Sequence, residues 1–190
     1  IILYINAGQL TAKTCWLSQL YIGTGAYDRL VFDNSYHYRH LLNNAVVPTP
    51  KGLYFNGATS YLQSKDKVTL PDVFTFSATV NCAIKSTIQA FLAQNTASYQ
   101  TDRLLIHRQA DSNDLNVIGT NGATIASIAG YFTGLDNTDI DLKVEIDFVS
   151  KTIKAYRNGV QFGSTVSAPT IVKPSSSYIY IGNLSSVIGL

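Results

Sequence analysis

Two carboxylates in the stretch VEIDF, residues 144–148, are spaced so that they could act together. Side chains two residues apart on a strand point to the same face, so Glu145 and Asp147 would lie side by side. A carboxyl pair about 5–5.5 Å apart can cleave a glycosidic bond, with one group as nucleophile and the other as general acid/base. Glu145 is the only glutamate in the chain. The two carboxylates could therefore belong to the active site of a glycosidase, or they could simply form the polar face of an ordinary strand.

The residues around this pair alternate in the manner of half-buried strands. In KVEIDF the apolar residues share one face and the charged residues the other, and FTFSATVNCAI (74–84) alternates in the same way. SSSYIYIGN (175–183) is a further strand candidate. A period of two predicts strands with one face in a core. We therefore expect seven apolar side chains to be buried: Phe74, Phe76, Val80, Val144, Ile146, Phe148 and Ile181.

Three Asn-Gly pairs, each between apolar or aromatic runs, predict turns. They are Asn56-Gly57, Asn121-Gly122 and Asn158-Gly159. Asn-Gly is the preferred pair for a two-residue type I′ hairpin, because both residues there have positive φ. Three such signals indicate antiparallel sheets.

Composition agrees with an all-β fold. Charged residues are 14% of the 190 residues, against roughly 25% in an average soluble domain. Strong helix formers are scarce, and the only plausible helix is around residues 11–20. The length suits one domain. We expect a segment of residues 1–29 that packs on a β-sandwich formed by residues 30–190.

Charge and hydropathy exclude two classes of partner. The net charge is +2 and the basic residues are scattered, which argues against nucleic acid. No apolar run approaches the ~18–20 residues that a membrane span requires. The chain begins at Ile1 and contains no Met, so we expect a processed or partial product.

The two cysteines leave two interpretations open. Cys82 falls on the apolar face of a predicted strand, where a free thiol is the simpler reading. A disulfide with Cys15 is the alternative, although two cysteines far apart in the sequence do not define a disulfide framework.

Two loops and one aromatic cluster are the remaining site candidates. QADSNDLN (109–116) and LDNTDID (135–141) offer hard oxygen ligands, so calcium is the one cofactor they suggest, with Asp111, Asp114, Asp136 and Asp139 as ligands. Asp and Asn also simply favour turns. The cluster of aromatic and polar side chains could stack on sugars or shape a turn; a metal there would lack its third and fourth ligands. It comprises Tyr36, His37, Tyr38, Arg39 and His40.

Three stretches, in order, resemble the concanavalin A-like lectin/glucanase superfamily, and within it the laminin-G-like jelly-roll modules. In LVFDNSYHYRHLL (30–42), Asp33, Ser35 and His40, with His37, match a motif that introduces a turn ending in histidine. KGLYFNGATSYLQ (51–63) resembles the hairpin of that family, followed at similar spacing by FTFSATV. VEIDFVSKTIKAYRNGV and then YIYIGN resemble its ending, a strand, Tyr-x-Asn-Gly and Ile-Gly.

The resemblance covers roughly residues 30–184 and implies an all-β, antiparallel jelly-roll β-sandwich. Such modules bind carbohydrate or protein in secreted, cell-surface and phage-particle proteins, and relatives often hold calcium at a rim of the sandwich. For the cluster at 36–40 the resemblance favours a role in shaping a turn. The family has a last strand after Ile-Gly, where this chain stops at SSVIGL. We expect residues 1–5, IILYI, to fill that place or to pair with another chain.

The glucanases of the superfamily carry Glu-x-Asp-x-x-Glu, or a form one residue shorter, on one strand. Glu145 and Asp147 match its first two positions, and Ser150 stands where the second Glu belongs. A serine cannot supply a tunable proton near neutral pH. We therefore interpret VEIDF as structural and expect no catalytic residue.

The sequence thus predicts a non-catalytic module that recognises glycan or protein at an extracellular or virion surface. The alternative is a structural or decoration subunit of a larger particle, such as a phage capsid or tail; a degenerate β-glucan hydrolase is a third. We expect the partners to be other protein subunits or a surface glycan, within an oligomer or larger assembly.

Overall fold

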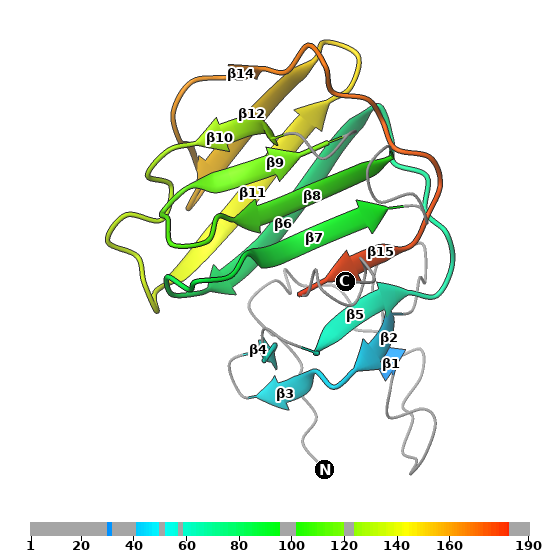
Figure 1. Cartoon of the computed structure of the whole chain (residues 1–190), viewed down its shortest axis with the longest axis vertical. Helices are drawn as coiled ribbons and strands as arrows, with labels where there is room; N and C mark the ends of the chain where they lie inside the picture. Colours follow the sequence, from blue (N-terminus) through cyan, green and yellow to red (C-terminus); the bar gives the residue numbers. More distant parts are fainter. Residues whose placement is uncertain are drawn as a thin grey trace, which may run out of the picture.

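A computed structural model describes residues 30–31, 41–49, 52–56, 59–95, 102–119 and 124–182. Every regular element in these ranges is a β-strand (Figure 1), as the composition predicts. Within the same ranges there is no helix of the length and hydrophobicity that a bilayer crossing needs. The expected segment 1–29, the helix at 11–20 and the strand IILYI lie outside the described residues.

The larger sheet contains eight antiparallel strands, and its last strand in the chain lies in its middle. β15 pairs with β5 on one side and with β7 on the other, so it has no free edge (Figure 1). The order across the sheet is β1 (Leu30–Val31), β2 (Leu41–Asn44), β5 (Tyr61–Ser64), β15 (Ile179–Ile181), β7 (Gln89–Asn95), β8 (Arg103–Arg108), β9 (Leu115–Ile118) and β10 (Thr124–Ile128).

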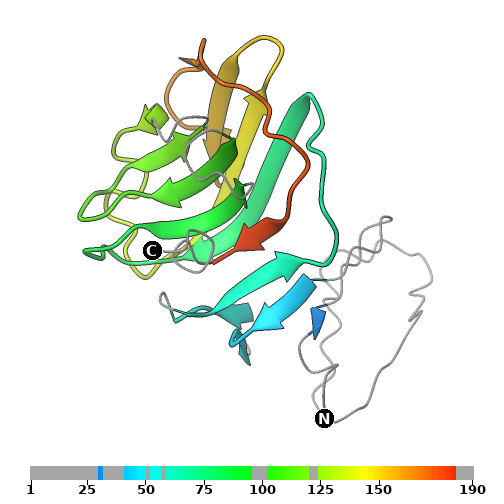
Figure 2. The same ribbon diagram turned by 45° about the vertical axis from the view of Figure 1, so that its right-hand side comes forward.

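The second sheet packs against one part of the first (Figure 2). Its main order is β13 (Val160–Gln161), β12 (Thr152–Arg157), β11 (Asp139–Asp147) and β6 (Val73–Asn81), and β14 (Val166–Ser167) also pairs with β12. A separate ribbon is formed by β3 (Val47–Thr49) and β4 (Gly52–Tyr54).

The path of the chain between the two sheets defines the architecture. It crosses from β5 to β6 and back to β7, crosses again from β10 to β11, and returns from β14 to β15. Repeated crossings between two antiparallel sheets are the mark of a jelly roll. The predicted all-β jelly-roll sandwich is therefore confirmed.

One hydrophobic core lies between the sheets, and alternation predicted much of it. On β11, Val144 and Ile146 are completely buried, and Phe76 and Phe148 are also buried, as predicted. Phe74 and Val80 pack against the same core but are only half-buried. They lie on β6, which ends its sheet, so fewer neighbours cover them. Ile181, near the end of the described chain, is half-buried too.

The three Asn-Gly pairs have different outcomes. Asn158 and Gly159 have φ of 51° and 82°, as a type I′ turn requires, and Arg157 pairs with Val160 across it. The pairing of β9 and β10 confirms the second hairpin, with Ile118 opposite Thr124 at its described end. Gly57 and Gly122 lie outside the described residues.

The hairpin predicted at Asn56 is wrong, because β4 pairs with β3 whereas β5 pairs with β2 and β15. Asn56 instead organises a loop, in which its Oδ1 accepts hydrogen bonds from the backbone N–H groups of Thr59 at 2.9 Å and Ser60 at 3.0 Å. An Asn side chain that accepts such bonds is as typical of loops as of hairpins.

Candidate functional site

Glu145 and Asp147 lie on the outward face of the five-stranded sheet, but each is bound to different partners. Glu145 Oε1 accepts a hydrogen bond from Lys154 Nζ at 3.2 Å, and its Oε2 lies 3.6 Å from Lys143 Nζ. Asp147 Oδ1 accepts the backbone N–H groups of Val149 and Ser150, both at 2.8 Å. Asp147 thus closes the turn between β11 and β12, while Glu145 forms a surface ion-pair cluster.

The electrostatics of this face agree with these structural roles. Hydrogen bonds from the backbone and side chain of Ser150 lower the pKa of Asp147, which keeps it ionised. The hydrogen bond to Glu145 raises the pKa of Lys154. A general acid needs the opposite environment, one that raises the pKa of a carboxyl group towards neutrality.

The same sheet face has a shallow hollow of about 580 Å³ over β6, β11 and β12. Ser77, Thr79, Asp141, Lys143 and Tyr156 contribute to its lining. Part of this polar lining makes contacts within the face: the Thr79 hydroxyl donates to Asp141 Oδ1 at 2.7 Å, and Lys143 Nζ lies 4.7 Å from the centre of the Tyr156 ring.

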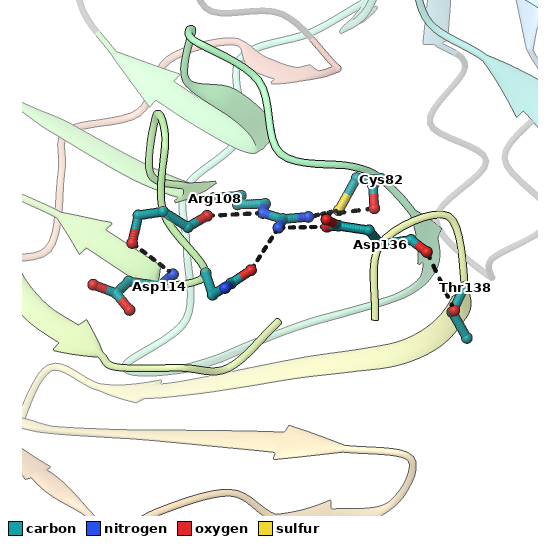
Figure 3. A network of polar contacts seen from close by, with 7 residues as sticks. Cys82, Arg108, Asp114, Asp136 and Thr138 are labelled. Atoms are coloured by element: carbon teal, nitrogen blue, oxygen red, sulfur yellow. Dashed lines mark hydrogen bonds and ion pairs between the residues drawn. The ribbon is translucent and has the colours of Figure 1, made fainter. Parts of the chain in front are cut away.

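The two Asp-rich loops meet at the guanidinium of Arg108 (Figure 3). Arg108 Nε donates to the carbonyl of Ser112 at 3.0 Å, and its Nη2 donates to Asn113 Oδ1 at 2.8 Å and to Asp136 Oδ1 at 2.7 Å. Nη1 reaches the carbonyl and Sγ of Cys82 at 3.3 and 3.6 Å. An arginine whose side chain is 1% exposed thus links the loops that suggested a calcium site.

The four predicted calcium ligands do not converge. Asp136 pairs with Arg108, Asp114 Oδ1 accepts the Gly130 N–H at 2.8 Å, and Asp139 Oδ1 accepts from Asn81 Nδ2 at 2.6 Å. Asp111 has a positive φ of 50° in its turn. Among the described residues there is no group of three or more potential metal ligands. Calcium binding remains a prediction, without support from this geometry.

Two other predicted features have separate outcomes. Tyr36, His37, Tyr38, Arg39 and His40 lie outside the described residues, so their role stays a prediction. Cys82 is a free, half-buried thiol packed against the core, and burial raises its pKa. Cys15 lies outside the described residues.

A second polar cluster, which the sequence did not reveal, lies on the face of the eight-stranded sheet that is turned away from the core, and its members His107 and Asn116 are buried there. His107 on β8 is opposite Asn116 on β9. His107 Nε2 and Asn116 Nδ2 both contact Gln109 Oε1, each at 3.1 Å. His107 is 0% and Asn116 6% exposed, yet His107 Nδ1 and Asn116 Oδ1 have no hydrogen-bond partner. Burial lowers the pKa of His107, so the ring is neutral at pH 7.

Aromatic side chains extend this face towards the middle of the sheet. Tyr180 on β15 packs beside Ala93 and Leu105, and Leu105 shares the face of His107. Tyr61 on β5 lies next to Tyr180, with ring centres 6.0 Å apart. Two strand spacings of about 4.8 Å and an offset of two residues, about 7 Å along the strand, place Tyr180 roughly 12 Å from His107. We call this surface, defined by Tyr61, Tyr180, His107, Asn116 and Gln109, the tyrosine–histidine face.

This face was missed because β8 does not alternate. RLLIHR is buried at every position, and a strand covered on both faces gives no period of two. The one available signal was the polar pair of His107 and Gln109 next to a run of aliphatic residues.

No family model and no curated protein matches the chain. Among solved structures, a β-glucanase of Bacillus licheniformis is 13% identical, with a TM-score of 0.46 over 82% of this chain and 68% of that one. The carbohydrate-binding module CBM66 of Bacillus subtilis is 14% identical, with a TM-score of 0.46 over 75% and 86%. The carbohydrate recognition domain of Emp47p is 16% identical, with a TM-score of 0.43 over 84% and 79%.

All three are less than 25% identical to this chain. The likeness concerns the fold alone, since an enzyme and two binding domains stand side by side at similar scores.

Proposed function

We propose that this protein is a non-catalytic recognition module that binds glycan on the tyrosine–histidine face. The observation that carries the proposal is the pair of buried acceptor-capable atoms without partners, His107 Nδ1 and Asn116 Oδ1. Buried polar atoms in proteins nearly always have a partner, whether protein, water or ligand. Sugar hydroxyls are donors that would supply one to each atom once the cover over these two buried side chains opens.

Three further features of this face suit a sugar. Gln109, His107 and Asn116 offer amide and imidazole groups that are fixed by their mutual hydrogen bonds. The half-buried Tyr61 and Tyr180 rings offer apolar surface with a polar tip, which suits ligands that are apolar on one side and wet on the other. The glycan-binding interpretation also agrees with the resemblance of the sequence motifs to lectin-like modules.

The five-stranded sheet supports the non-catalytic part of the proposal. Glu145 is held between two lysines, and Asp147 is held in a turn by backbone N–H groups. The hydrogen bonds from Ser150 lower the pKa of Asp147, which is the opposite of what a general acid needs near neutral pH. A degenerate β-glucan hydrolase is therefore the weaker alternative.

A glycan array, with and without calcium, tests the proposal. We expect at least one glycan to bind, and Asn116→Ala or Tyr180→Ala to weaken binding by about tenfold or more, the equivalent of one lost hydrogen bond or ring contact. Tyr156→Ala is the matched control on the other sheet and should bind as the wild type does.

Binding to no glycan would contradict the proposal, as would binding that is lost in Tyr156→Ala and kept in Asn116→Ala. The first of these results would favour the alternative of a structural or decoration subunit, for which the specific observation is that β6 pairs only with β11 among the described residues.

A further inference from the structure

We propose that β6 forms an interface with a second copy of this chain, in which the two β6 strands pair antiparallel about a twofold axis at Ser77. This would join two five-stranded sheets into one continuous sheet. The inference is independent of glycan binding, because β6 and the tyrosine–histidine face belong to different sheets.

The first observation is the unprotected edge. β6 spans nine residues, Val73–Asn81, and is the last strand of its sheet (Figure 2). Among the described residues it pairs with β11 alone. The strand contains no charged residue and no proline, and its pairing with β11 has no bulge. Natural proteins usually protect a long, flat edge with charged residues, prolines or bulges, because a bare edge pairs with other chains. The edge of β6 has none of these protections.

The second observation is the incomplete cover of its inner side chains. Phe74, Ala78 and Val80 point into the sandwich and pack on the core, yet they are only half-buried. An added strand beside β6 would bring further apolar side chains against them. Burial of that remaining apolar surface would favour association.

The third observation identifies the occupant, because β6 is complementary to itself. Pairing centred on Ser77 places Thr75 opposite Thr79 on the outward face. On the inward face it places the large Phe74 opposite Val80 and the large Phe76 opposite the small Ala78. No like charges meet, and pairs of threonine are favourable across antiparallel strands. A twofold interface requires this kind of self-complementarity.

Sedimentation of the full chain, with two charge variants, tests the interface. Thr75→Lys/Thr79→Lys would place lysines opposite each other in the dimer, whereas in the monomer these positions face Glu145 and Asp141, so the fold should be kept. The matched control, Val160→Lys/Gln161→Lys, adds the same charge to β13 at the opposite edge of the sheet. We expect a dimer for the wild type and the control, and at least a hundredfold weaker association for Thr75→Lys/Thr79→Lys.

Three results would overturn the proposal. They are a monomeric wild type at about 100 μM, a dimer lost only in the β13 variant, and a dimer lost on deletion of residues 1–5. The last result would assign the interface to IILYI.

Disulfide trapping tests the proposed register of the two β6 strands without relying on charge. In a Cys15→Ala/Cys82→Ala background, Ser77→Cys should give a covalent dimer on mild oxidation, since paired antiparallel Cα atoms about 4.5–5.5 Å apart fall within disulfide range. Thr75→Cys alone should not, because it faces residue 79 of the other copy. The reverse pattern, or no covalent dimer in either variant, contradicts the proposed pairing.

Discussion

At the scale of single residues, the partners of a side chain decide its role more than its type does. Glu145 and Asp147 share a face and could have formed an acid/base pair. Instead, Lys143 and Lys154 form ion pairs with Glu145. The backbone N–H groups of Val149 and Ser150 donate hydrogen bonds to Asp147. The serine at position 150 donates to Asp147 and supplies no second carboxylate.

The first prediction concerns Glu145→Gln. The variant should show the same glycan binding as the wild type and the same background level of reducing-sugar release from β-glucan, because in our proposal Glu145 forms only surface ion pairs. Its cost in stability should stay within about 1 kcal/mol, the usual range for exposed ion pairs. Hydrolysis by the wild type that disappears in Glu145→Gln would refute the non-catalytic interpretation.

The second prediction concerns Phe148, which is buried where β11 ends. Phe148→Ala should lower the free energy of unfolding by about 3–5 kcal/mol, because it removes buried surface and leaves a cavity. Val149, next in the chain, is 73% exposed, so Val149→Ala is the matched control and should cost less than about 0.5 kcal/mol. Urea denaturation of the two variants measures the difference; equal costs would mean that the register of β11 is wrong.

At the scale of elements, single turns and loops depend on particular residues. The hairpin of β12 and β13 requires positive φ at Asn158 and Gly159. Gly159→Val should destabilise the fold by more than about 1 kcal/mol, because a β-branched residue is strained there. Gly159→Asn should cost clearly less, since Asn tolerates this region. Thermal or urea unfolding ranks the variants, and equal costs would argue against the type I′ turn.

Arg108 has the same importance for the Asp-rich loops. Arg108→Met should lower the free energy of unfolding by about 1–3 kcal/mol, the range for a lost hydrogen bond to a charged or buried group. The ion pair with Asp136 adds little to this loss, because the Asp136 side chain is 43% exposed and solvent screens its charge. Calcium should leave the unfolding midpoint of the wild type unchanged. A rise in that midpoint with calcium, reversed by chelator, would support the calcium prediction.

What the sequence could reveal at this scale follows from burial. β6 and β11 were predictable because one face of each meets water, so their residues alternate. β8 and β9 are buried at every position and carry no such signal. The hairpin predicted at Asn56 was wrong because an Asn-Gly pair indicates a turn but does not determine which strands pair on either side of it. Arg108 could not be predicted as the link between the loops, because its partners are distant in the sequence.

At the scale of the whole molecule, the sheet order brings together segments that no local pattern connects. β15 enters between β5 and β7, and this places Tyr180 beside Tyr61 and on the same face of the sheet as His107. The candidate glycan face is therefore a product of topology. The same order leaves β6 at an edge, where the proposed partner binds.

The last prediction concerns the stability of the molecule as a function of pH. Burial lowers the pKa of His107 below its ordinary value of 6.5, with a smaller lowering from the charge of Arg103 and an opposing effect of Gln109. The unfolded chain thus takes up a proton at higher pH than the folded chain. The stabilisation is fully present above about pH 6.5 and is lost as pH falls from there towards the folded pKa, by at most about 1.4 kcal/mol per pH unit.

His107→Gln removes this titration and keeps a neutral side chain that can hydrogen-bond to Gln109. Urea unfolding of both proteins between pH 7.5 and 5 should therefore show a wild-type advantage that shrinks as the pH falls. A difference that stays constant over this range would mean that His107 titrates equally in the folded and unfolded chains. In that case the histidine would be solvated in the folded protein, and the buried acceptor on which the glycan proposal rests would not exist.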